Sequence, residues 1–104
     1  MERMYETDPA IFALRREEVD GWILKDRQEG GPLQEIHGAV FPIAVMPVDG
    51  ANSIVLVHRS RCPWADRPFV VWNFHMYGGF SEGDYDLTMR NGLERFAHRV
   101  ERGY

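Results

Sequence analysis

The sequence predicts an α+β domain in which a three-stranded antiparallel sheet packs one face against an N-terminal and a C-terminal helix, in the order α-β-β-β-α. Three observations support this prediction. Apolar strand patterns occupy the middle of the chain, short turn signals separate them, and helical periodicity flanks them on either side. The chain has 104 residues, 44% of them hydrophobic and 27% charged, and this suits one globular domain spanning residues 1–104.

The first helix is predicted to span residues Pro9 to Glu29. Asp8 can cap free backbone N–H groups, Pro9 suits the first helical position, and a Gly-Gly-Pro sequence ends the segment. Apolar residues recur near one face: Ile11, Phe12, Val19, Trp22 and Ile23. One alternative remains open, because the helix could stop at Gly21 and residues 22–28 could then form a strand.

Three strands are predicted in the middle of the chain. The first, His37 to Pro47, contains two prolines that cannot donate ladder hydrogen bonds, so it should lie at a sheet edge or carry a bulge. A turn at residues 49–52, where Gly50 and Asn52 could take positive φ, should pair it antiparallel with a strand from Ser53 to Arg59. The third strand is predicted from Phe69 to Tyr77.

Alternate side chains of the third strand differ in polarity. One set is wholly apolar and should face the helices: Val70, Trp72, Phe74 and Met76. The other set includes Asn73 and His75, and we expect its histidine to face solvent. Four residues are expected to be among the most buried: Trp72, Phe74, Leu93 and Phe96.

The second helix is predicted to begin after Asp86. Apolar residues then recur on one stripe: Met89, Leu93, Phe96, Ala97 and Val100. The acids that precede the stripe, Glu82, Asp84 and Asp86, are interpreted as caps of the helix N-terminus, where their charge is also favourable. The alternative is that their carboxylates form an oxygen-ligand cluster for a divalent cation.

Charge and composition restrict the functional class and the compartment. A net charge of −4 argues against nucleic-acid binding and is consistent with a basic partner surface. Cys62 is the single cysteine, which is ordinary for a reducing cytoplasm, and the acidic start of the chain lacks the apolar region of a secretory signal. The longest apolar run, Ala39 to Val48, is too short to cross a bilayer. We therefore expect a cytoplasmic protein that does not bind membranes.

The loop around Cys62 is the segment that invites a catalytic hypothesis. Three arginines neighbour it in the sequence and could lower its pKa: Arg59, Arg61 and Arg67. His58, Cys62 and His75 could converge as metal ligands, but no paired ligand motif accompanies them, so we expect no metal and no cofactor. We expect His37 and His98 to be solvated. A small Cys- or metal-dependent enzyme using this region is the alternative function.

Aromatic and arginine residues outside the predicted core favour a non-enzymatic protein-interaction module. Trp64 lies in a polar loop, and aromatic residues recur after the third strand; such residues with arginine commonly anchor protein interfaces. The predicted binding residues are Arg61, Trp64, Arg67 and Tyr85, with Trp64 as the anchor. The two loops leave opposite ends of the third strand, so they could lie apart. The partner is expected to be a protein, and a homodimer is an alternative.

The C-terminal third of the chain resembles small uncharacterised proteins of phages and mobile elements. The resemblance rests on the strand Phe69 to Tyr77, the turn Gly83-Asp84-Tyr85 and the helix end from Phe96 to Arg99. It implies an accessory role, such as binding and modulating or inhibiting a host or element protein. No catalytic residues come with it.

Overall fold

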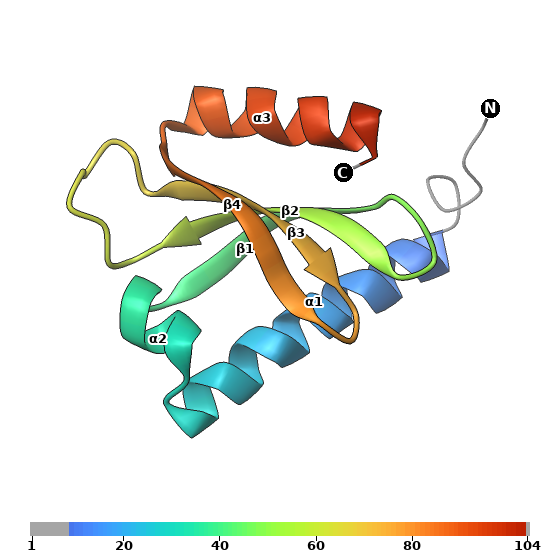
Figure 1. Ribbon diagram of the computed structural model, residues 1–104, viewed down its shortest axis with the longest axis horizontal. Coiled ribbons are helices and arrows are strands. Elements are labelled where there is room, and N and C mark those ends of the chain that lie inside the picture. Colours follow the sequence, from blue (N-terminus) through green and yellow to red (C-terminus); the bar gives the residue numbers. More distant parts are fainter. Residues whose placement is uncertain (1–8, 104) are drawn as a thin grey trace.

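The computed structural model describes residues 9–103, which form a four-stranded antiparallel sheet with helices on both of its faces (Figure 1). The strands lie in the sheet in chain order: β1 (Val40–Pro47), β2 (Asn52–Arg59), β3 (Phe69–His75) and β4 (Gly79–Leu87). The helices are α1 (Pro9–Glu29), α2 (Pro32–His37) and α3 (Met89–Arg102). The α+β class and the antiparallel pairing are confirmed, whereas the prediction of three strands is wrong.

The first helix has the predicted bounds, and it continues through Gly21 without a break. The alternative of a strand over residues 22–28 is therefore wrong. Asp8, the expected cap, lies outside the described residues. Arg15 of α1 is buried, and its guanidinium Nη2 donates to the carbonyl oxygens of Asp49 (3.3 Å) and Gly50 (2.8 Å), which ties α1 to the β1–β2 turn.

The β1–β2 turn is closed by its own aspartate. The Asp49 carboxylate accepts hydrogen bonds from the backbone amides of Ala51 (2.8 Å) and Asn52 (2.7 Å). Burial alone would raise the pKa of Asp49, but these hydrogen bonds and the charge of Arg15 outweigh it and hold the pKa below its ordinary value. Neither Gly50 nor Asn52 takes positive φ in this turn, and the predicted antiparallel pairing of the two strands is confirmed.

The short helix α2 was not predicted, and it changes the position of His37. Asp26 at the end of α1 positions α2, because its carboxylate accepts from the backbone amides of Leu33 (3.1 Å) and Gln34 (2.7 Å). His37 is consequently the last residue of a helix, and β1 begins three residues later than expected, at Val40.

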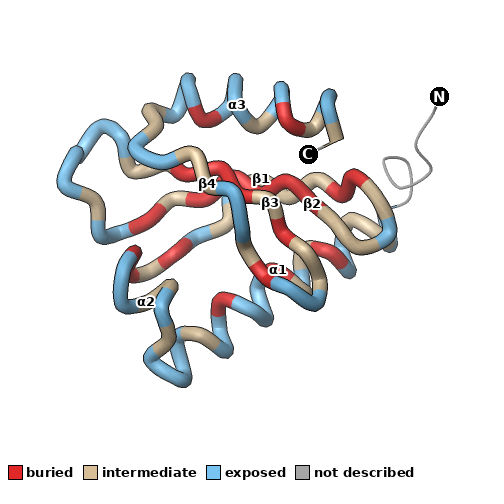
Figure 2. The backbone as a smooth tube through the Cα atoms, viewed as in Figure 1, coloured by how far each residue is buried: buried red, intermediate tan, exposed pale blue. Residues whose placement is uncertain are grey.

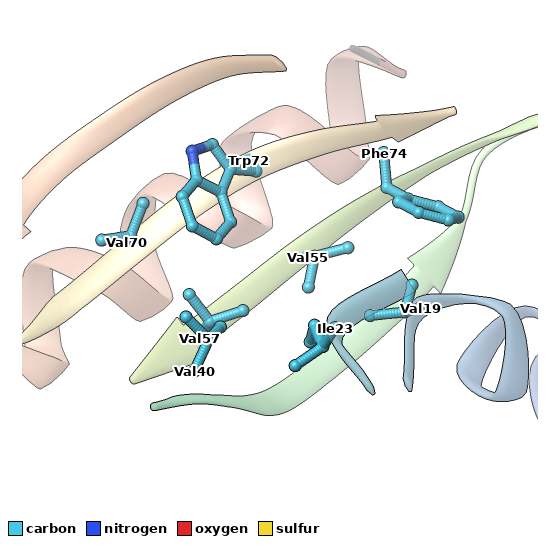
Figure 3. Close-up of a cluster of buried hydrophobic side chains, with 8 residues drawn as sticks. All are labelled: Val19, Ile23, Val40, Val55, Val57, Val70, Trp72 and Phe74. Atoms are coloured by element: carbon cyan, nitrogen blue, oxygen red, sulfur yellow. The ribbon is translucent and has the colours of Figure 1, made fainter. Parts of the chain in front are cut away.

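The two long helices cover opposite faces of the sheet, so the prediction that both pack on one face is wrong (Figure 1). The core beneath α1 contains Val19, Ile23, Val40, Val55, Val57, Val70, Trp72 and Phe74 (Figure 3). A second core on the other face contains Val48, Ile54, Leu56 and Val71, against which Phe96 and Val100 of α3 pack. Burial is concentrated in the two central strands (Figure 2).

Both faces of β3 are covered, and α3 supplies a hydrogen-bond partner for its polar residue. Trp72 and Phe74 are buried beneath α1 as expected. On the opposite face, the Asn73 side-chain oxygen accepts a hydrogen bond from Nη1 of Arg99 (2.9 Å). Leu93 was expected to be buried but is 49% exposed, and Phe96 is only partly buried, because the stripe that faces the sheet includes Gly92 and Arg99.

The fourth strand, β4, occupies the segment that was predicted as a loop and helix cap. It is an irregular edge strand, with positive φ at Glu82 (54°) and Asp86 (56°). Thr88 caps α3 instead of the acids, since its side-chain oxygen accepts from the amide of Asn91. Asp84 pairs with Arg99 (2.7 Å), so the capping interpretation of these carboxylates is wrong. At the other edge β1 has an irregularity between Pro42 and Ala44, as its prolines predicted.

Candidate functional site

A pocket of about 270 Å³ lies between the end of α1, α2 and the β3–β4 hairpin. Its lining is mainly aromatic and aliphatic: Trp22, Asp26, Pro32, Leu33, Ile36, His37, Trp72, Gly78, Gly79, Phe80 and Tyr85. Three large apolar side chains of the lining are also exposed to solvent, namely Ile36 (59%), Tyr85 (44%) and Trp22 (37%). The pocket is therefore surrounded by large apolar groups that no described residue covers.

Trp22 forms one wall of the pocket, whereas the sequence placed it in the core. Its ring meets Phe74 edge-on, with centroids 6.2 Å apart, and its Nε1–H donates to the carbonyl oxygen of Met76 (3.2 Å). Gly79 allows this position. It has φ of +78°, and a Cβ there would lie 2.8 Å from Cζ3 of Trp22. Any other residue at 79 would therefore displace the ring.

The most buried titratable side chain in the pocket lining is His37, which is only 7% exposed. Its ring stacks on Tyr85, with centroids 5.8 Å apart and an interplanar angle of 12°, and it meets Trp72 edge-on at 5.2 Å. The indole Nε1–H of Trp72 donates to the hydroxyl oxygen of Tyr85 (2.9 Å). The expectation that His37 is solvated is wrong, because α2 carries it over the sheet; His98 is exposed as expected.

Arg59 of β2 holds His37 in one orientation. Its Nη1 lies 3.1 Å from Nδ1 of His37, and because a guanidinium can only donate, Nδ1 is the acceptor. Its Nη2 pairs with Oδ1 of Asp86 at 2.5 Å, and its guanidinium carbon lies 5.7 Å from the ring centroid of Tyr85. Arg59 thus links β2, α2 and β4 through one buried cation.

The electrostatic surroundings favour a neutral His37. Burial lowers the pKa of His37, because the imidazolium would lose its hydration, and the charge of Arg59 lowers it further. The carboxylate of Asp26 opposes these two effects without reversing them. A neutral ring that accepts at Nδ1 carries its proton on Nε2.

We expect folding stability to fall when the pH drops below the ordinary histidine value of 6.5. The unfolded chain takes up a proton at His37 in that range, whereas the folded chain does so only at lower pH. The contribution of His37 to the free energy of unfolding should therefore be constant above pH 6.5. As the pH falls below 6.5, the free energy of unfolding should decrease by at most about 1.4 kcal/mol per pH unit.

Urea unfolding of the wild type and of His37→Asn between pH 7.5 and 5.0 checks this expectation. The variant should lose less stability over this range, because its amide does not titrate while the other three histidines are unchanged. Asp49 does not interfere, because its lowered pKa acts below 3.8. Equal slopes for the two proteins would contradict the assignment.

The four predicted binding residues divide into two groups. Tyr85 lines the pocket, and Arg61 lies beside it, since its Nη1 donates to the carbonyl oxygen of Glu35 in α2. Trp64, which is 57% exposed, and the exposed Arg67 lie in the β2–β3 loop and do not line the pocket. Sequence reasoning missed Trp22, Ile36 and His37 as pocket residues. The available signal was that Trp22 precedes and Ile36 follows the Gly-Gly-Pro sequence, where a turn of the chain can bring two large apolar side chains together.

The structure separates the candidate metal ligands. Strand pairing places His58 opposite Phe69 and His75 opposite Asn52, so the two histidines lie at opposite ends of the β2–β3 ladder, roughly 20 Å apart at about 3.3 Å per residue. Within residues 9–103 no group of three His, Cys, Asp or Glu side chains is placed to hold a metal ion.

Cys62 lies close to a cation and a carboxylate, but none of its described contacts is to a histidine. Its Sγ lies 3.3 Å from the carbonyl oxygen of Arg67, 3.7 Å from Oδ1 of Asp86 and 3.8 Å from Nη2 of Arg59. Nδ1 of His37 is already bonded to the same arginine. The thiol's described acceptors are a backbone carbonyl and a carboxylate, so the Cys–His pair that activates many catalytic thiols is not formed among these residues.

Comparison of the chain with protein-family models, curated proteins and solved structures finds no match. Among the helices of residues 9–103, none has both the length and the apolar character needed to span a bilayer.

Proposed function

We propose that the protein is a non-enzymatic protein-interaction module that receives a bulky apolar side chain of its partner in the pocket between α2 and the β3–β4 hairpin. The observation that supports this most strongly is the combination of an aromatic-walled pocket with exposed large apolar side chains around it. Large apolar groups gathered at one concave place are typical of binding sites, whereas isolated ones are ordinary on any surface.

The β2–β3 loop extends the proposed surface. Its Arg61 is bonded to α2, and Cys62 lies close to Asp86 of β4, so the loop begins beside the residues that border the pocket. Trp64 offers a second exposed anchor on the same loop. Interfaces of this kind depend on a few aromatic and arginine anchors, which is the composition present here.

The net charge of −4 supports a partner with a basic surface, because complementary charge speeds association and excludes like-charged proteins. A cytoplasmic location and the accessory or inhibitor role expected from the resemblance to phage and mobile-element proteins stay predictions. The alternative of a Cys-dependent enzyme has less support, because no described histidine contacts the thiol of Cys62.

The matched substitutions Ile36→Asp and Leu14→Asp test the proposed function. Both residues lie on helices, are about equally exposed (59% and 50%) and differ in that Ile36 alone lines the pocket. With a partner identified by copurification from the organism that encodes the chain, Ile36→Asp should weaken binding at least about tenfold by calorimetric titration. Thermal unfolding of both variants should match the wild type within a few degrees.

Leu14→Asp should leave the affinity unchanged. If the two variants bind the partner equally well, the partner does not use the pocket. A loss of affinity in both would indicate an interface along α1 instead.

A further inference from the structure

Two side-chain donors of the pocket, the hydroxyl of Tyr85 and Nε2 of His37, have no acceptor among the described residues. The indole N–H of Trp22 is used by the carbonyl of Met76, and the carboxylate of Asp26 is engaged by two backbone amides of α2. The hydroxyl oxygen of Tyr85 accepts from Trp72, which leaves its proton free to be donated. An acceptor on a ligand can pair with these two donors.

His37 is the most strongly oriented of these donors. Arg59 occupies its Nδ1, the stack on Tyr85 and the edge contact with Trp72 fix the plane of its ring, and Asp86 in turn holds Arg59. Its Nε2–H has no partner among the described residues, although the side chain is more than nine-tenths buried. Nε2 is not among the fully buried unpaired atoms, so water reaches it from the pocket in the free protein, and an acceptor on a ligand would replace that water.

The size and walls of the pocket restrict what accompanies the acceptor. A volume of about 270 Å³ is below the range of roughly 300–1,000 Å³ that is usual for pockets of whole small-molecule ligands, so it suits one large side chain. Four of the lining residues are aromatic: Trp22, Trp72, Phe80 and Tyr85. Aromatic rings gain most from edge-on and offset contacts with other rings.

We infer that the pocket recognises an aromatic side chain of a partner polypeptide together with a neighbouring backbone carbonyl, which accepts a hydrogen bond from Nε2–H of His37. The inference rests on the proposed function and specifies the chemistry of the partner at the same site. His37 is then a specificity determinant: the aromatic walls bind the ring, and the imidazole requires a carbonyl at a set distance from it.

The test uses two probes that share an indole ring. N-acetyl-L-tryptophanamide carries carbonyl acceptors beside the ring, and 3-methylindole has none. Both are titrated to millimolar concentration into the full-length ¹⁵N-labelled protein, and the indole N–H signals of Trp22 and Trp72 report binding at the pocket. The amide probe should bind about fivefold more tightly than 3-methylindole, which is the effect of one added hydrogen bond.

Two variants separate the roles of the imidazole nitrogens. In His37→Asn the amide oxygen can still accept from Arg59, but no donor reaches the position of Nε2. In His37→Gln the amide nitrogen lies near that position and can donate. We expect the preference for the amide probe to fall to less than about twofold in the Asn variant and to be largely kept in the Gln variant. The readout is the ratio of the two affinities within each protein, because loss of the imidazole from the lining affects the binding of both indole rings alike.

The outcomes distinguish the inference from the proposed function. Equal affinity of the wild type for the two probes, or an undiminished preference in His37→Asn, overturns the role of His37 while leaving pocket binding in place. If neither probe shifts the signals of Trp22 and Trp72, the proposed pocket function is overturned, and the inference with it.

Discussion

Phe74→Ala is expected to lower the free energy of unfolding by about 3–5 kcal/mol. Phe74 of β3 has no exposed surface and is the largest of the fully buried side chains among the described residues. Its ring contacts Phe80 with centroids 5.1 Å apart and meets Trp22 edge-on at 6.2 Å. Truncation removes the transfer free energy of the ring and leaves a cavity that the paired strands on both sides prevent from closing.

A loss of this size is a large share of the stability of a domain of 104 residues, which is about 5–15 kcal/mol. The midpoint of thermal unfolding should fall by roughly 15–30 °C, and urea unfolding should give the matching change in free energy. Tyr77→Ala is the control, since Tyr77 is 79% exposed, and it should change stability by less than about 0.5 kcal/mol. Similar losses for both variants would mean that Phe74 does not lie in the core.

Arg59→Met should cost about 2 kcal/mol of stability, the second largest effect expected. The side chain of Arg59 is 10% exposed, and methionine keeps most of its apolar stem while removing the guanidinium. Nδ1 of His37 then loses its donor in a buried position, whereas Asp86, which is 43% exposed, can be hydrated. The expected cost is therefore below the roughly 3–5 kcal/mol of a fully buried pair.

The same substitution should change the pH dependence of stability. Because the charge of Arg59 lowers the pKa of His37, its removal should raise that pKa and reduce the loss of stability between pH 7.5 and 5.0. Arg90→Met is the control, since the side chain of Arg90 is 88% exposed, and it should leave both stability and pH profile unchanged. A large loss of stability in Arg59→Met with an unaltered pH profile would contradict the coupling between Arg59 and His37.

The pocket could be predicted only in part from the sequence. Tyr85 and Arg61 were predicted as binding residues, and the structure places Tyr85 in the lining and Arg61 against α2. His37 could not be predicted, because a histidine between two apolar segments has the same pattern whether it ends a helix or begins a strand. Its burial depends on α2, whose start is stabilised by the carboxylate of Asp26 rather than by a residue adjacent to it in the sequence.

The fourth strand and the placement of α3 were missed for different reasons. The segment Gly79–Leu87 is rich in glycine and acidic residues, and its bulges interrupt the alternation by which a strand is recognised. The run from Ile54 to Val57 did contain a usable signal. Four consecutive buried apolar residues in β2 indicate a strand covered on both faces, which one helical layer cannot achieve.

The sequence by itself determined the elements whose causes are local: the bounds of α1, the edge position of the proline-containing β1, the hairpin at Asp49 and the apolar set of Trp72 and Phe74 in β3. Only the tertiary structure decided against which face of the sheet each helix packs. An amphipathic stripe shows that one side of a helix is buried, but it does not specify the surface that buries it. It also decided the pairing of Arg59 with His37 and Asp86, since these groups are 22 and 27 residues apart and chain spacing does not encode contact over such distances.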